Sequence, residues 1–279
     1  MNDRGPFGDL ALRQYLAEQM KIVFSYTHAI VIEKTGIGTG VAFRLGERLF
    51  LITAGHNLTK KFEVKLFAQE GPAITAEVLN SHFHPDSLRD NVCRDFGFIE
   101  IKNIPSLPAC EVEQFHIGEP TPRIVRDGLW FVAGCPESGF LPPNSPGQIG
   151  LAVVSGFPRG GDEASVEIDY ARTGHSISPD GSFFEESEFF ATPRGFSGGG
   201  VWVLSKPAGG ELFMPHRHVK LCGTQFRWNE RKRFLRAMRP RFTLPYLFDW
   251  YPELRADYGH LLRSCVNEPS SDDGSAERV

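Results

Sequence analysis

A serine set among glycines is the first group in this sequence that could do chemistry. Residues 192–202 read TPRGFSGGGVW, so Ser197 lies between Gly195 and Gly198, just before a short apolar run. A serine hydroxyl is a weak nucleophile unless a histidine takes its proton and an acid orients that histidine. The glycines allow the N–H groups of Gly195 and Ser197 to converge on one point, where an oxyanion would be held. The pattern therefore indicates acyl transfer, provided that a base and an acid can be found.

The same residues fit a second pattern. G-x-S-x-G is also the nucleophile elbow of α/β-hydrolases, which requires a helix directly after the serine and then an acid and a histidine. Asp249 and His260 follow in that order. However, three consecutive glycines followed by VWVL are a poor helix start, because glycine costs about 1 kcal/mol of helix propensity and β-branched residues favour strands. The sequence therefore predicts that a strand follows Ser197.

The candidate base is His56 and the candidate acid is Asp95. His56 follows the apolar segments GVAFRL and RLFLITA, which predict a hairpin through residues 45–48 and an imidazole just past the second strand. Asp95 directly precedes the apolar run FGFIEI, so its carboxylate could sit at the edge of a core and accept from an imidazole N–H. Asp86 and Asp90 are nearby rivals, but they lie in a polar, proline-containing stretch.

The elements that must position these residues are predicted to be mainly strands. Short segments rich in Val, Ile and Phe alternate with Gly, Pro, Asn and Asp, without long helices between them, which is typical of antiparallel β structure. A proline-rich stretch at about residues 104–123 indicates a connector between two sets of strands. Apolar residues at helical spacing predict an amphipathic helix over residues 9–21, and a further helix closes the chain.

The segments TAGH, DFGFIEI and GFSGGGVWV, in the order His, Asp, Ser, resemble the trypsin-like (chymotrypsin-fold) serine peptidases, especially their bacterial and intracellular members. The resemblance covers about residues 23–228. It implies two six-stranded antiparallel β-barrels with the active site in the cleft between them. It also implies that Ser197 attacks the substrate, His56 is the base, Asp95 orients it, and the N–H groups of Gly195 and Ser197 form the oxyanion hole. No cofactor and no metal are expected.

The fold class that follows is mainly β, a chymotrypsin-like double barrel with N-terminal and C-terminal helices. We predict a helical extension over residues 1–22, a first barrel over 23–110 that carries His56 and Asp95, a second barrel over 111–243 that carries Ser197, a C-terminal helix over 244–266, and a disordered tail over 267–279.

The predicted function is that of a serine endopeptidase acting on protein or peptide substrates. Many secreted relatives carry an acid just before the serine, which receives a newly cut N-terminus, but this chain has Phe196 there, so activation by such cleavage is not expected. The alternative is a partner-activated or largely non-catalytic binding or regulatory module, whose oxyanion turn forms only when an activating protein binds. An esterase would use the same site.

The resemblance also indicates the residues of the substrate pocket. Ala191 stands six residues before the serine, at the base of the pocket, so no carboxylate awaits a lysine or arginine side chain. Thr192, Gln225, Phe226 and Arg227 are predicted to line its walls. These residues suit apolar or medium polar side chains, and Arg227 leaves acidic ones open.

Charge and cysteine content exclude other classes of function. With Lys+Arg 30 against Asp+Glu 34, the formal net charge of −4 gives no whole-chain attraction to nucleic acid or to an anionic membrane, so neither is an expected partner. The basic run over residues 227–241 is interpreted as a solvated face, paired with the acidic residues Glu185, Glu186 and Glu188. The pairs in HFH and HRH lack further ligands, so no metal site is predicted. Five scattered cysteines, with no secretory signal and no membrane-spanning run, predict a cytoplasmic protein.

Overall fold

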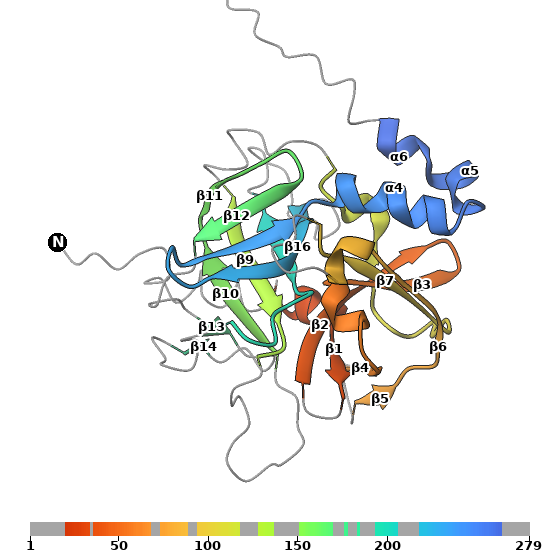
Figure 1. Cartoon of the computed structure of the whole chain (residues 1–279), viewed down its shortest axis with the longest axis horizontal. Coiled ribbons are helices and arrows are strands. Elements are labelled where there is room, and N and C mark those ends of the chain that lie inside the picture. The colour runs from red at the N-terminus through yellow and green to blue at the C-terminus, as the bar shows by residue number, and fades with distance from the viewer. Residues whose placement is uncertain are drawn as a thin grey trace, which may run out of the picture.

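The computed structural model describes residues 20–33, 36–67, 73–88, 94–117, 128–136, 151–169, 176–177, 183–184, 193–205 and 218–263. These residues form two β-sheets whose pairings are antiparallel except for one short parallel pair. In Figure 1 the first sheet runs from red to yellow, the second from green to blue, and three short helices follow at the blue end. The expectation of a mainly β chain with two sets of strands is confirmed.

The first sheet has the strand order β5-β4-β1-β2-β3-β7-β6, and β8 pairs with β2 in parallel. Its strands are β1 (Thr27–Ile32), β2 (Gly36–Leu45), β3 (Arg48–Thr53), β4 (Phe62–Leu66), β5 (Ile74–Thr75), β6 (Val78–Phe83), β7 (Gly97–Ile101) and β8 (Cys110–Glu111). Among the described residues, the single-turn 3-10 helices η2 (Gly55–Leu58) and η3 (Pro85–Leu88) lie between strands of this sheet, and η4 (Val112–Gln114) follows β8.

The predicted hairpin is the pair β2 and β3. Leu45 lies opposite Arg48, and Gly46 in the two-residue turn has φ +57°, a left-handed conformation that glycine adopts without steric cost. From Leu49 to Thr53 every side chain of β3 is buried, so the segment leading to His56 is fixed inside the molecule.

The second sheet has the order β11-β12-β17-β16-β15-β9-β10-β13-β14. Its strands are β9 (Leu129–Gly134), β10 (Ala152–Gly156), β11 (Pro158–Gly161), β12 (Ser165–Asp169), β13 (Ser176–Ile177), β14 (Phe183–Phe184), β15 (Gly200–Leu204), β16 (Val219–Asn229) and β17 (Phe234–Met238). The strand β15, which begins three residues after Ser197, lies in the middle of this sheet between β9 and β16.

The N-terminal helix differs from the sequence-based expectation. Residues 20–26 are helical, so the first strand begins at Thr27 and not within the apolar run that starts at residue 21. Met20, Val23 and Phe24 are buried at helical spacing, which explains why this run forms a helix face. The Thr27 hydroxyl donates to the Val23 carbonyl at the end of the helix. Residues 9–19 of the predicted helix lie outside the described residues.

The C-terminal segment forms three short helices, α4 (Pro240–Trp250), α5 (Leu254–Tyr258) and α6 (His260–Arg263), where one helix from residue 244 was predicted. Proline at the first helical position explains the earlier start, since its missing N–H would be unpaired there anyway. Although α4 follows the last strand of the second sheet, the helices lie beside β3 and β7 of the first sheet (Figure 1). Residues 264–279, including the predicted tail, lie outside the described part.

A charged contact also ties the end of the chain to the first sheet. Arg48 pairs with Glu100 at 2.7 Å and with Glu253, and its guanidinium lies 4.5 Å from the centre of the Tyr251 ring. Burial alone would raise the pKa of Glu100, but hydrogen bonds from Arg48 and Asn80 outweigh it and lower that pKa. The carboxylate therefore stays charged where β3, β7 and the C-terminal helices meet.

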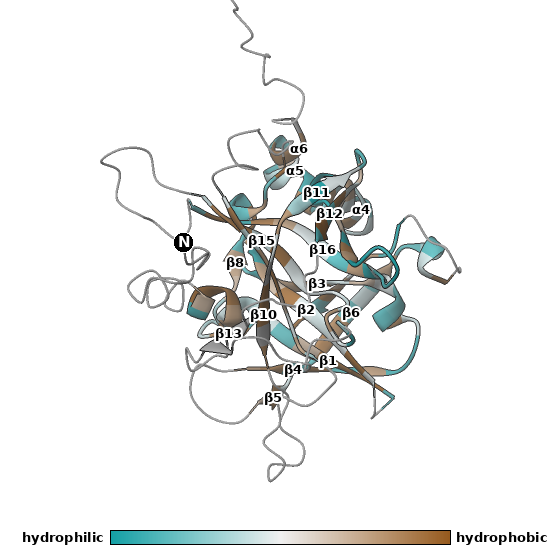
Figure 2. Cartoon of the chain, turned by 90° about the vertical axis from the view of Figure 1, so that its left-hand side faces the viewer, coloured by the Kyte–Doolittle hydropathy of each residue, from teal (hydrophilic) through white to brown (hydrophobic). Residues whose placement is uncertain are grey.

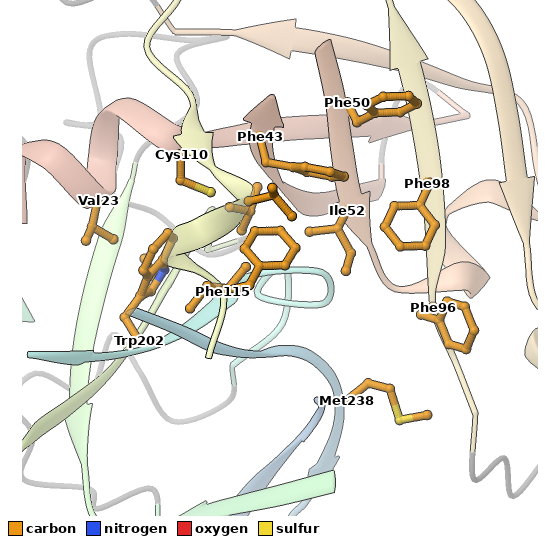
Figure 3. Close-up of a cluster of buried hydrophobic side chains, with 14 of the residues drawn as sticks. Val23, Phe43, Phe50, Ile52, Phe96, Phe98, Cys110, Phe115, Trp202 and Met238 are labelled. Atoms are coloured by element: carbon orange, nitrogen blue, oxygen red, sulfur yellow. The ribbon is translucent and has the colours of Figure 1, made fainter. Parts of the chain in front are cut away.

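The main hydrophobic cluster joins the two sheets. Phe43 of β2 stacks on Phe50 at 5.5 Å and meets Phe115 at 5.1 Å, while Trp202 and Met238 enter the same cluster from the second sheet (Figure 3). Figure 2 shows hydrophobic residues gathered along the central strands. Burying each such side chain contributes roughly 1.5–3 kcal/mol, so the two sheets are held as one body.

A second cluster lies on the opposite face of the second sheet, and we call it the inner cluster. Its members are Trp130, Val132, Val154, Val166, Ile168, Phe196, Val201, Val203, Cys222, Leu235 and Ala237. Within the described ranges, no helix is long and apolar enough to cross a membrane.

Candidate active site

His56 and Asp95 are in direct contact. His56 lies in η2, immediately after β3, and its side chain is 41% exposed. The Asp95 carboxylate accepts two hydrogen bonds from it, one from the backbone N–H at 2.9 Å and one from Nδ1 at 2.6 Å. Because a carboxylate can only accept, Nδ1 carries the proton and Nε2 is left with a free lone pair. The imidazole is thus in the tautomer that can take a proton from a hydroxyl group.

A glycine before the histidine permits this contact. A Cβ atom on Gly55 would lie 2.7 Å from the Phe96 carbonyl oxygen and 2.1 Å from the Ser87 hydroxyl. Any other residue would push η2 away from the segment that carries Asp95. The small-residue turn in TAGH therefore brings base and acid segments close together.

Aromatic rings of α4 cover the residues that flank Asp95. Phe96 packs against Tyr246 at 5.1 Å and Trp250 at 6.3 Å, measured between ring centroids. Arg94, on the other side of Asp95, donates a hydrogen bond to the Tyr246 hydroxyl at 2.9 Å. The acid is therefore held in place by a helix that follows the second sheet, a contact that no local sequence pattern indicates.

The histidines of HFH take part in the same packing. His82 stacks on Trp250 at 5.2 Å, and His84 meets the edge of Tyr246 at 4.9 Å. Within the part of the chain that the structure describes, no group of three or more His, Cys, Asp and Glu residues could hold a metal ion.

The turn that carries Ser197 has a defined backbone. The Phe196 N–H donates to the Pro193 carbonyl at 3.2 Å, and Gly195 between them has φ +88°. Residues 193–196 thus form a β-turn, and a positive φ at its third residue is typical of type II. A type II turn differs from a type I turn in that the peptide between the second and third residues is reversed. The N–H of that peptide belongs to Gly195, so the turn type sets the direction of a predicted oxyanion donor. A strand follows the turn at Gly200, which contradicts the α/β-hydrolase elbow.

Three polar residues on the side of the first sheet hold this turn, and we call them the clasp: Thr39 and Asn57 bond to the turn, and Thr53 bonds to both of them. The Ser197 carbonyl accepts from the Thr39 N–H at 2.7 Å and from Asn57 Nδ2 at 2.8 Å. The Thr39 hydroxyl donates to the Gly195 carbonyl at 2.6 Å, and the Thr53 hydroxyl donates to the Thr39 carbonyl at 2.6 Å. Since Asn57 directly follows His56, the serine backbone is bonded to the neighbour of the candidate base.

Close approach across the interface requires glycine at position 198. A Cβ atom there would lie 1.9 Å from the Thr39 carbonyl oxygen and 2.2 Å from the Thr53 hydroxyl, and Gly198 has φ +91°. Both the space and the backbone conformation exclude other residues. The glycine after the serine therefore lets the two sheets meet at the site.

Phe196 anchors the turn on its other side. Its side chain is fully buried in the inner cluster, and a Cβ atom on Gly134 would lie 2.7 Å from its ring. Phe196, which stands just before the serine, is thus held by apolar packing within the second sheet.

The predicted pocket residues are only partly described. Gln225 and Phe226 are buried in β16, and Arg227 is exposed. The Gly198 N–H donates to the Gln225 carbonyl at 2.6 Å, and the Gln225 N–H donates to the Gly199 carbonyl at 2.8 Å, so β16 lies directly beside the serine turn. Ala191 and Thr192 lie outside the described residues.

Cysteine nucleophiles are disfavoured where the structure describes them. Cys110, Cys135 and Cys222 are free and buried. Burial raises the pKa of the Cys135 thiol to about 12 and raises that of Cys222 further, so neither is a thiolate at neutral pH.

The basic run after β16 pairs with acids other than those expected. Arg236 contacts Asp162 and lies 3.7 Å from Glu167, and Arg241 lies 3.9 Å from Glu163. Asp162 and Glu163 belong to the segment that joins β11 and β12, and Glu167 belongs to β12, while residues 185–188 lie outside the described part. Arginines of this basic run therefore pair with acidic residues of the same fold.

Comparisons with known proteins agree with the fold. No protein-family model matches the sequence, and no curated protein matches it. Among solved structures, the chain is similar to HL collagenase with a TM-score of 0.51 and 14% identity, over 86% of this chain and 95% of that one. A Glu endopeptidase in complex with MPD gives a TM-score of 0.46 and 11% identity, over 77% of this chain and 85% of that one. The chain has the chymotrypsin-like double-barrel fold.

Proposed function

We propose that the chain is a serine endopeptidase that hydrolyses peptide bonds in protein substrates. Two sets of hydrogen bonds support this proposal: Asp95 accepts two hydrogen bonds from His56, and Asn57, the next residue, donates to the backbone carbonyl of Ser197. The double-barrel fold, shared with a collagenase, supports the same reaction class.

In the proposed reaction, the Ser197 hydroxyl attacks the carbonyl carbon of the substrate while His56 Nε2 takes its proton. Asp95 keeps Nδ1–H oriented and stabilises the imidazolium. The N–H groups of Gly195 and Ser197 hold the oxyanion of the tetrahedral intermediate. His56 then gives the proton to the leaving amine, and an acyl-enzyme remains. Water attacks the acyl-enzyme by the same steps, with His56 again as base, and releases the acid product.

The geometry of the turn that carries Ser197 favours an enzyme that is active without a bound partner. The alternative module would need an oxyanion turn that forms only on binding. Instead, the type II geometry at Gly195, the clasp bond to its carbonyl and the burial of Phe196 all favour a preformed turn. Cleavage of the N-terminus has no role in this proposal.

The test is labelling by a fluorophosphonate together with cleavage of a peptide library. The wild-type protein should be labelled at Ser197 and should cut peptides, and Ser197→Ala should lose both. Ser205→Ala, a change at a partly exposed serine just past β15, is the matched control and should behave as wild type. Labelling that persists in Ser197→Ala would refute the assignment. Ester cleavage without amide cleavage would indicate an esterase.

We also propose that the protein functions in the cytoplasm. The three described cysteines are unpaired thiols, as a reducing compartment such as the cytoplasm allows. Alkylation of thiols in the freshly isolated denatured protein, followed by mass spectrometry, would count them; a disulfide involving any of the three would contradict the proposal.

A further inference from the structure

Gln225 has a special position beside the serine turn. Its backbone exchanges hydrogen bonds with the two residues that follow Ser197, at 2.6 Å with Gly198 and 2.8 Å with Gly199. The resemblance to trypsin-like peptidases predicts that Gln225 lines the pocket for the residue that supplies the scissile carbonyl, and these bonds place its backbone beside the proposed nucleophile.

The side chain of Gln225 faces the inner cluster. Gln225 lies directly opposite Ala237 of β17, and side chains opposite each other in an antiparallel pair share one face. Gly223, two residues earlier and so on the same face, lies opposite Val201. Because Val201 and Ala237 both belong to the inner cluster, Gln225 brings an amide to an otherwise apolar face.

The amide oxygen has no partner. Gln225 is 1% exposed, and its Oε1 atom is fully buried without a hydrogen bond in the structure. Thr224 Oγ1 and Trp202 Nε1 are also buried without partners, but Trp202 belongs to the main cluster and Thr224 lies opposite Met238, another member of it. Of these three groups, Gln225 alone faces the inside of the second sheet. A buried unpaired amide at a site of proposed chemistry calls for a partner from the substrate.

We propose that Gln225 selects substrates with a primary amide side chain, glutamine or asparagine, at the residue that supplies the scissile carbonyl. This rests on the proposed peptidase function. A primary amide is uncharged and carries two N–H donors, whereas a serine or threonine hydroxyl carries one, so the amide of a substrate glutamine or asparagine can satisfy the Gln225 oxygen with an N–H group. A site built to bond such a group rejects substrates that lack it, because its own polar atoms are then left unpaired.

Charged side chains suit this position less well. The face that Gln225 shares with Val201 and Ala237 is apolar, so a charged side chain would lose its water there without gaining an opposite charge. Arg227, the nearest charged residue along the strand, is exposed. A neutral polar side chain is therefore favoured over both lysine and glutamate.

The first experiment uses the wild-type protein and two peptides. They are identical except that one has glutamine and the other methionine before the scissile bond, since methionine has a similar length and no amide. The expected kcat/KM is at least roughly tenfold higher for the glutamine peptide. A ratio near one overturns the proposal without the need for any variant.

The second experiment changes Gln225 itself. Gln225→Met should bring the ratio for the two peptides to one or below, and Gln225→Glu should favour lysine or arginine at the same position, because a carboxylate complements their charge. Thr224→Val is the matched control, on the opposite face of the same strand, and should keep the wild-type ratio. An active Gln225→Met protein with an unchanged ratio shows that the amide is only structural.

Fluorophosphonate labelling separates the two proposals. If Ser197 is labelled and peptides are cut without preference for an amide, the specificity inference is wrong and the peptidase function stands. If neither labelling nor cleavage occurs, the peptidase function fails and takes this inference with it.

Discussion

His56 and Asp95 lie beside the first sheet and are fixed by each other and by the rings of α4, whereas the turn around Ser197 lies beside the second sheet and is fixed both by the clasp and by residues of its own sheet. The base and acid segments meet through Gly55 and are covered by α4. The serine turn depends on the clasp for two of its carbonyls and on Phe196 for its anchor. Residues on the side of the first sheet thus contact both the pair of base and acid and the serine turn. Changes in the clasp should disturb the serine and spare the base, while changes at Asp95 should do the reverse.

The largest effect is expected on the base side. Asp95→Asn should lower kcat by about 10⁴-fold, because an amide cannot hold both the backbone N–H and Nδ1–H of His56 and so favours the wrong tautomer. The folded state should persist, which circular dichroism would check. Asp86→Asn, at the rival acid, is the control and should keep wild-type kcat; equal losses in the two variants would remove Asp95 from its role.

The next effect is expected at the anchor of the serine turn. Phe196→Ala should reduce the free energy of unfolding by about 3–5 kcal/mol, since it leaves a cavity in the inner cluster. Phe196→Leu should cost less and keep more fluorophosphonate labelling, because it still fills part of that space. Urea unfolding measures the first quantity. Full stability in Phe196→Ala would show that burial does not hold the turn.

A smaller and more selective effect is expected for the clasp. Asn57→Leu removes one of the two donors to the Ser197 carbonyl, the Thr39 N–H being the other, and should lower kcat up to roughly tenfold, in line with about 0.5–1.5 kcal/mol for one hydrogen bond. KM should change less, because the pocket wall in β16 is untouched. Asn80→Leu, which removes a hydrogen bond to Glu100 elsewhere on the first sheet, is the matched control. A loss of stability with no loss of kcat would make Asn57 a purely structural residue.

The smallest effect concerns the acid stability of the first sheet. His28 is completely buried, which lowers its pKa to about 3, while its Nδ1 accepts from the Phe67 N–H at 3.2 Å. Below the ordinary histidine pKa the unfolded chain binds a proton that the folded chain refuses, so stability is present near neutrality and falls as the solution is acidified. The loss should be about 2 kcal/mol by pH 5.

The variant His28→Gln tests this pH dependence. Glutamine keeps an acceptor for the Phe67 N–H and has no titrating group, so the difference in unfolding free energy between pH 7 and pH 5 should shrink by that amount. Urea unfolding at the two pH values provides the measurement. An unchanged difference would show that His28 is protonated in the fold or that the chain unfolds from elsewhere.

Local sequence patterns indicated the strands and the turn, because their signals lie within a few residues. The alternation around residues 45–48 predicted the hairpin, and the glycines after Ser197 predicted a strand there, as observed. The clasp could not be predicted in this way. Asn57 and Ser197 are 140 residues apart, and nothing near Asn57 reveals that its amide will meet a carbonyl of the other sheet. In the sequence near Thr39, only Gly38 and Gly40 indicate that another segment packs closely there.

The helices at the end of the chain illustrate the same limit. The sequence predicted one helix from residue 244 but gave no sign of which sheet it would cover, because aromatic residues such as Tyr246 and Trp250 can pack on any apolar surface. The unpaired amide oxygen of Gln225 is likewise a property of the assembled fold, because it depends on the absence of a hydrogen-bond donor beside it.

The crossing of α4 onto the first sheet has a consequence for biosynthesis. Translation makes every strand of both sheets before it makes this helix, so the barrels can begin to form on the ribosome while the rings beside Asp95 are still bare. Until α4 emerges from the exit tunnel, its aromatic rings do not cover the loop that carries Asp95. The nascent chain would therefore assemble its scaffold first and tighten its acid–imidazole pair last.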